Sequence, residues 1–260
     1  MKYPGLGLPV QSLSDPLGFI ILAVVGALAG FLNVMAGGGS ALTIPLMIFM
    51  GYDATVANGS NRIAIQVEAL TAVATFKQHN HSDFPMSLKL GLMTLPGGIL
   101  GAFYAVKIDD ALFTKILGGV MLLIIISLMF PKSELVEHAK AHKWSKVLAW
   151  PVMSVVGFYG GFIQAGVGFV IMAALLHLYR LDLVKINMHK VFIVMVFTVP
   201  AVILFIVTGN VDWFAATALS IGMMGGTWVA VKMAIKKGEK LVRLMLGVAL
   251  LIIAVKLFLM

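Results

Sequence analysis

The chain contains no cysteine in its 260 residues, which excludes disulfide bonds, thiolate metal sites and thiol catalysis. Charge is also scarce, since only 12% of the residues are Asp, Glu, Lys or Arg, whereas a soluble domain averages about 25%. Hydrophobic residues make up 60% of the chain, and its mean hydropathy is +1.02. These values exclude an ordinary soluble domain and place the chain in a lipid bilayer.

The apolar runs have the length of membrane-spanning helices, for which about 20 residues suffice. They cover residues 17–51, 61–76, 88–106, 112–130, 147–179, 190–208, 213–231 and 241–259. None alternates strictly, as a barrel strand would, so the sequence predicts an all-α polytopic membrane protein. The net charge of +8 comes from residues between these runs. Because no basic stripe is interleaved with aromatic residues, we expect no nucleic-acid partner.

Two of the runs, 17–51 and 147–179, are much longer than one membrane span requires. A single helix of that length would reach about 50 Å, well beyond a hydrocarbon core of about 30 Å. Both runs carry glycine in the middle: Gly37, Gly38 and Gly39 in the first, and Gly157, Gly160, Gly161, Gly166 and Gly168 in the second. We expect each run to form a broken re-entrant hairpin.

The two halves of the chain repeat. When the second half is aligned on the first, Asn58 falls on Asn187 and Asp83 on Asp212, and a small slip upstream places Gly37 on Gly168. Chance matching between two apolar sequences is the alternative, but turn and charged positions are also in register. The predicted organisation is an N-terminal tail (1–16), membrane repeat 1 (17–130), an amphipathic cytoplasmic linker (131–146) and membrane repeat 2 (147–260). The tail lacks the basic region of a cleaved signal peptide.

Basic residues indicate how the repeats are oriented. If each long run crossed the membrane once, 11 of the 19 Lys and Arg residues would face one side and 8 the other. If each long run returns to its own side, the split is 14 to 5. The positive-inside rule favours the second arrangement. It makes the repeats inverted, each with a hairpin plus three transmembrane helices, and places both termini in the periplasm.

Irregular backbone at membrane depth is tolerated where it is buried in protein or lines a wet cavity. A helix that restarts at Ser40 would present free N–H groups and a positive dipole end to an anion. Ser40 and Thr43 add hydroxyl groups, and Asn33 adds an amide. The alternative is that the glycines serve close helix packing, which is the role we expect for Gly26 and Gly30.

A second polar stretch, Ala57-Asn58-Gly59-Ser60-Asn61-Arg62, is predicted to begin the next helix and to present its N–H groups to the anion. Its partner in the second half is Ile186-Asn187-Met188-His189-Lys190. Arg62 and Lys190 would add fixed positive charge, Arg62 with a geometry suited to oxyanions. The alternative for Arg62 is a simple interfacial anchor.

Glu68 lies among apolar residues two turns into the same segment. An ionisable group at that depth marks a functional site by default, and we expect Glu68 to carry a coupling proton. The alternative is a structural pairing with Lys190. The histidines suggest no metal geometry, and no catalytic motif is visible. No cofactor, metal or enzymatic activity is therefore expected.

The stretch from Asn33 to Pro45, followed by Ala57 to Asn61, resembles the signature of the TauE/SafE sulfite exporter family. The positions that match it are Asn33, Gly37, Gly38, Gly39, Pro45, Asn58, Ser60 and Asn61. The second half departs from the pattern, with Gln164-Ala-Gly-Val-Gly-Phe in place of the glycine run and with His189 and Lys190 after Asn187. The resemblance implies transport of small sulfur-containing anions across a bacterial inner membrane.

The sequence thus predicts a secondary transporter that moves sulfite, sulfonate or sulfoacetate by alternating access, with proton coupling as an option. A passive anion channel is the runner-up, and an intramembrane enzyme or a sensor is a more distant alternative. The expected substrate-binding residues are Asn33, Gly37, Gly38, Gly39, Ser40, Thr43, Asn58, Ser60, Asn61, Arg62, Gln164, Asn187, His189 and Lys190. The expected partners are a small anionic substrate and the lipid bilayer, and a homodimer is left open.

Overall fold

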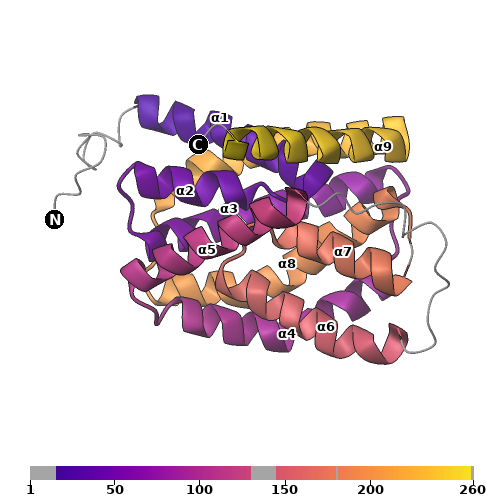
Figure 1. Cartoon of the computed structure of the whole chain (residues 1–260), viewed down its shortest axis with the longest axis horizontal. Coiled ribbons are helices and arrows are strands. Elements are labelled where there is room, and N and C mark those ends of the chain that lie inside the picture. The colour runs from indigo at the N-terminus through magenta and orange to yellow at the C-terminus, as the bar shows by residue number, and fades with distance from the viewer. Residues whose placement is uncertain (1–15, 130–144, 180, 259–260) are drawn as a thin grey trace.

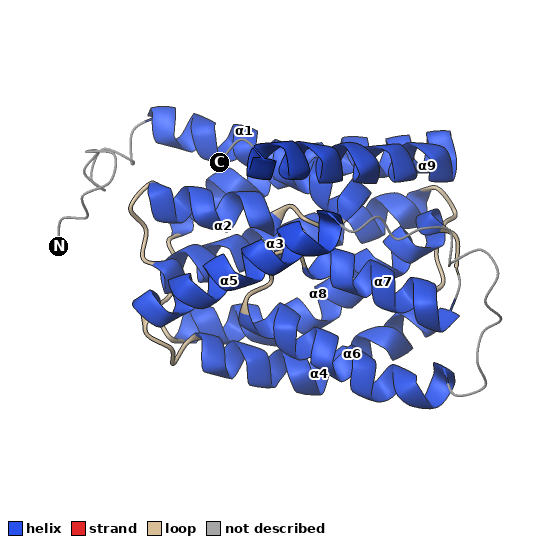
Figure 2. Cartoon of the chain, in the orientation of Figure 1, coloured by secondary structure: helices blue, strands red, loops and turns tan. Residues whose placement is uncertain are grey.

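The computed structural model describes residues 16–129, 145–179 and 181–258. These residues form nine helices and no strand, which confirms the all-α class (Figure 2). The helices are α1 (Pro16–Ala36), α2 (Ser40–Phe49), α3 (Ala54–Gln78), α4 (Phe84–Ala105), α5 (Asp110–Met129), α6 (Ser145–Phe162), α7 (Val167–Tyr179), α8 (Leu183–Val207) and α9 (Trp213–Phe258). The predicted tail and linker lie almost wholly outside the described residues.

Four of the described helical stretches are long and apolar enough to cross a membrane: α1, α4, α8 and the first part of α9, Trp213–Lys237. The sequence predicts two separate segments after Asp212, at 213–231 and 241–259. The structure instead assigns one helix through both. The intervening stretch is rich in Lys and Glu, which are good helix formers, and it contains no proline.

The loops gather at two ends of the bundle (Figure 1). The first end holds the α2–α3, α4–α5 and α8–α9 loops, where Thr55 donates to Asp110 and the main-chain N–H of Asp212 donates to Ser60. The second end holds the α3–α4 and α7–α8 loops. The helices therefore run between two surfaces, as spans of a bilayer would.

Both long apolar runs form broken hairpins, as their glycines predict. α1 starts at the first end, stops at Ala36, and α2 returns to the first end (Figure 1). α6 and α7 form the corresponding hairpin from the second end, where Trp150 and Tyr179 line a common cavity. Gly37 has φ +90° and Gly166 has φ +70°. These backbone angles favour glycine, which explains its place at the turns.

The polar stretches do not begin helices, so that prediction is wrong. α3 starts at Ala54 and α8 at Leu183, several residues before the polar stretches. Asp182 caps α8 by accepting a hydrogen bond from the main-chain N–H of Lys185. Asn58 to Arg62 therefore lie inside α3, where main-chain N–H groups bond within the helix. Only their side chains are available to a ligand.

Glycines allow the closest helix contacts. α1 packs against the first part of α9, and a Cβ atom on Gly26 or Gly30 would fall within 3.0 Å of the α9 backbone. α4 packs against α6 in the same manner through Gly157 and Gly161. This is the packing role predicted for Gly26 and Gly30, since small residues let membrane helices approach closely.

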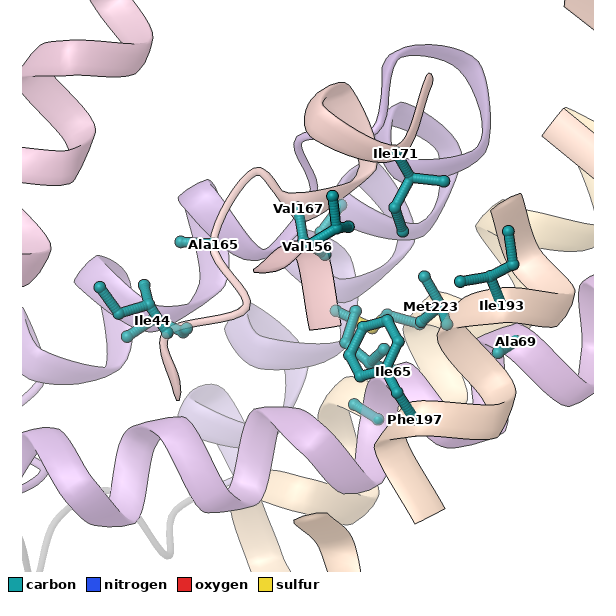
Figure 3. Packing of buried hydrophobic residues seen from close by; sticks show 14 of the residues in the cluster. Ile44, Ile65, Ala69, Val156, Ala165, Val167, Ile171, Ile193, Phe197 and Met223 are labelled. Atoms are coloured by element: carbon teal, nitrogen blue, oxygen red, sulfur yellow. The ribbon is translucent and has the colours of Figure 1, made fainter. Parts of the chain in front are cut away.

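The main hydrophobic core lies between the two hairpins. It includes Ile44 of α2, Ile65 of α3, Val167 of α7, Phe197 of α8 and Met223 of α9 (Figure 3). Because these residues come from both halves of the chain, the core joins the two hairpins.

Candidate functional site

The first hairpin break, between α1 and α2, brings an amide and a carboxylate together. Asn33, in the last turn of α1, donates from Nδ2 to Oε2 of Glu68 over 2.7 Å. Its own Oδ1 accepts a long hydrogen bond of 3.4 Å from the main-chain N–H of Gly39. Glu68 lies on α3 and is 2% exposed. The break thus contains a buried carboxylate that contacts the end of α1 through a neutral amide.

Lys190 of α8 reaches the same break from the opposite half. Its Nζ donates to the main-chain oxygens of Asn33 and Val34, over 2.8 and 2.9 Å. It also donates to Oδ1 of Asn187 over 2.7 Å. A lysine ammonium has three donors, and these three oxygens use all of them. Lys190 therefore binds carbonyls in the last turn of α1, where its charge suits a helix C-terminus. The Asn33 oxygen also accepts from the main-chain N–H of Gly37.

Arg62 of α3 has the corresponding role at the second break, between α6 and α7. One guanidinium nitrogen donates to the oxygens of Gly160 and Gln164, at 3.1 and 2.9 Å. The other donates to the oxygens of Gly161 and Phe162, at 2.5 and 3.1 Å. Arg62 is completely buried, so it is not an interfacial anchor.

Other side chains hold this second break in place. Asn58 donates from Nδ2 to the oxygen of Phe162 over 3.0 Å, and Phe205 lies against the Arg62 guanidinium, with 5.0 Å between its ring centre and Cζ. Gln164 donates weakly to Thr198, and the hydroxyl of Tyr159 donates to the oxygen of Ala165. Each broken helix is thus capped by a cation that comes from the other half of the chain.

The structure divides the expected site residues among four places. The first break gathers Asn33, Gly37, Gly38, Gly39, Ser40, Thr43, Asn61, Glu68, Asn187 and Lys190. The second break gathers Asn58, Arg62 and Gln164. Ser60 lies at the first end of the bundle, where it accepts from Asp212, and His189 bonds Ser87 over 2.8 Å towards the second end. Thr198, Tyr159 and Phe205 were missed, since a single such residue in an apolar run carries no signal.

Several buried polar atoms have no hydrogen-bond partner in the described residues. The donors among them are Nδ2 of Asn61, Nδ2 of Asn187 and Nε of Arg62. The acceptors are Oδ1 of Asn58 and Oε1 of Gln66, and the hydroxyl of Thr227 is also unpaired. Buried polar groups are nearly always bonded, so these atoms are candidates for contact with a ligand.

Comparisons with known proteins identify the family of the chain. The family model described as sulfite exporter TauE/SafE matches residues 22–257. A probable membrane transporter protein of Sinorhizobium is 27% identical over 248 residues, which cover 93% of this chain and 94% of that protein. The probable membrane transporter protein YfcA of Escherichia coli is 26% identical over 247 residues, covering 94% and 90%. No solved structure matches the chain significantly. The chain is therefore a member of the sulfite exporter TauE/SafE family of membrane transporters.

Proposed function

We propose that this membrane transporter carries small sulfur-containing anions by alternating access between inverted halves. The observation that carries the proposal is the contact between the two hairpin tips. A Cβ atom on Gly37 would fall within 3.0 Å of the Gly168 backbone. The starts of α2 and α7 therefore lie close together inside the bundle.

An anion is the ligand that suits this place. The start of a helix carries a partial positive charge, and the starts of α2 and α7 meet here. The start of α2 is bordered by Asn33, Ser40, Thr43 and Asn61. The preference for sulfur-containing anions rests on the family, whose description names sulfite.

Two features support inverted halves. In Figure 1 α3 runs from the first end to the second, and its counterpart α8 runs in the opposite direction. The helix pairs that pack through glycine also correspond between the halves. α1 of the first half packs on α9 of the second, and α6 of the second half packs on α4 of the first. Inverted repeats around a central site are a common construction for alternating access.

The charge distribution supports the orientation. Among the basic residues whose side chains the structure describes, those at the second end include Lys77, Lys89, Lys185, Lys232, Lys236 and Lys237, whereas those at the first end are Lys107 and Lys115. The positive-inside rule places the second end in the cytoplasm. In a bacterial inner membrane the start of α1 is then periplasmic, as we expect for both termini.

Glu68 is the residue to which we assign proton coupling. It is buried at the first break, and its described hydrogen bond comes from the neutral amide of Asn33. A carboxyl group in this position gains or loses a proton beside the proposed anion site. Movement of a proton with the anion would link transport to the pH gradient.

The test is sulfite flux into proteoliposomes that contain the purified protein, measured with and without an imposed pH gradient. Thermal-shift assays with sulfite, sulfate, thiosulfate, taurine and sulfoacetate show which anions bind. We expect protein-dependent uptake and a stabilising shift with at least one sulfur-containing anion. If none of these anions shifts the melting temperature or crosses the membrane, the proposed function is wrong.

A further inference from the structure

The two hairpin breaks differ in the polar atoms that they leave unpaired. Beside the first break the unpaired side-chain atoms are donors, Nδ2 of Asn61 and Nδ2 of Asn187. Beside the second break they are Oδ1 of Asn58, an acceptor, and Nε of Arg62. Asn58, Asn61 and Asn187 are all fully buried. The first break therefore offers an anion two neutral amide donors, whereas the second offers one donor, Nε of Arg62, beside an unpaired acceptor.

Asn61 is held with its amide nitrogen free. Its Oδ1 accepts a hydrogen bond of 2.6 Å from Oγ1 of Thr43, which lies in the first turn of α2. The amide of Asn61 is therefore beside the helix start that follows the first break. Nδ2 is a double donor, and it has no partner among the described residues.

Asn187 is oriented by Lys190. The ammonium can only donate, so the atom of Asn187 that lies 2.7 Å from it must be the oxygen. The same ammonium binds the main-chain oxygens of Asn33 and Val34 at the end of α1. Asn187 is thus linked through Lys190 to the end of α1, whereas Asn61 contacts the start of α2 through Thr43.

Pseudosymmetry shows what has changed at the second break. The alignment that pairs Asn58 with Asn187 also places Asn61 on Lys190 and Thr43 on Met172. Within the first half Thr43 bonds Asn61. Within the second half their counterparts are also in contact, since Nζ of Lys190 lies 3.8 Å from Sδ of Met172. Arg62 has no basic counterpart, since the same alignment places it on Val191. Its guanidinium occupies the carbonyl end of the second break, where four oxygens accept from it.

We propose that the transporter binds one oxyanion per chain, at the α1–α2 break, with the Nδ2 groups of Asn61 and Asn187 as ligands. In this arrangement Arg62 and Lys190 are positioning residues that hold the broken helices, and they do not contact the anion. Neutral donors suit a small oxyanion, whose several oxygens accept from the two amides beside the positive end of α2. This inference rests on the proposed function and narrows it to one site.

The experiment measures sulfite binding by calorimetry for the wild type and for matched asparagine variants. Asn61→Ala and Asn187→Ala each remove a proposed ligand. Gln78→Ala is the control, because Gln78 lies on the same helix, α3, but is its exposed last residue. Asn61→Asp is a second variant, since it keeps an acceptor for Thr43 while it replaces the donor with an oxygen.

We expect one sulfite per chain and a loss of affinity of about 10- to 100-fold in Asn61→Ala and Asn187→Ala, as for a lost hydrogen bond to a charged group. Asn61→Asp should bind still more weakly, and Gln78→Ala should keep its affinity within about threefold. Two sulfites per chain, unchanged affinity in both ligand variants, or an equal loss in Gln78→Ala would overturn the single site. If the wild type binds none of the sulfur anions, the proposed function itself is wrong. That outcome differs from one in which sulfite binds but the asparagine variants keep their affinity, which would overturn only the single site.

Discussion

Gly37 and Gly168 lie against each other although they belong to opposite halves of the chain. Each stands at a hairpin break, Gly37 just after α1 and Gly168 in the first turn of α7. The two main chains approach so closely that neither position has room for a Cβ atom. The contact joins the two hairpins at their tips, and it sets how far apart the starts of α2 and α7 can be.

Replacing Gly37 with alanine should therefore destabilise the protein. The residue has φ +90°, and an unfavourable backbone angle alone costs about 1–3 kcal/mol. The new Cβ would also collide with the Gly168 backbone. We expect a lower melting temperature in detergent. Gly225→Ala is the control, because a Cβ there meets no atom within 4 Å, and its melting temperature should stay the same or rise. Equal effects in both variants would contradict this close contact.

Loss of Arg62 should weaken the second hairpin. Arg62→Gln removes a guanidinium that bonds three main-chain oxygens at the end of α6, and an unpaired buried acceptor costs about 1–3 kcal/mol. We expect the free energy of unfolding to fall by about 2–4 kcal/mol, as measured by chemical denaturation in detergent.

Two further variants make the measurement specific. Arg62→Lys should lose less stability, because an ammonium still offers three donors. Lys89→Gln removes an exposed cation at the second end and should have little effect. If Arg62→Gln were as stable as Lys89→Gln, the guanidinium would not be what holds α6.

Much of the fold follows from length, hydropathy and glycine. The break after Ala36 was predictable because the apolar run is too long for one span and contains Gly37 to Gly39. The start of α3 at Ala54, before the polar stretch, was not predictable from the sequence. A run of polar residues usually marks the edge of a membrane segment, but here Asn58 and Arg62 face carbonyls of the other half.

The sequence singles out the polar residues that meet at the two breaks, but it does not show how they pair. Sequence shows that Arg62 and Lys190 are basic residues at the starts of apolar segments, which suggests an anion ligand. It does not show that main-chain oxygens at the ends of α6 and α1 lie beside them. Those contacts join residues from opposite halves of the chain, which no local pattern can pair. Only the folded chain reveals that the cations already have partners.

Glu68→Gln should uncouple transport from protons. The amide keeps an oxygen that can accept from Asn33, so the local structure should survive, but it cannot exchange a proton. We expect sulfite uptake into proteoliposomes that no longer responds to a pH gradient. Asp53→Asn is the matched control, since Asp53 is exposed in the α2–α3 loop. A glutamine variant with the full gradient dependence of the wild type would rule out Glu68 as the coupling residue.

The inverted topology can be tested with single cysteines, because the natural chain has none. Thr208 is exposed at the first end and Ser82 at the second. The excess of lysine at the second end predicts that it faces the cytoplasm. In intact cells a membrane-impermeant maleimide should label Thr208→Cys, whereas Ser82→Cys should react only after the cells are opened. The reverse pattern would mean that the protein has the opposite orientation. Labelling of both variants in intact cells would contradict a bundle whose two ends lie on opposite sides of the membrane.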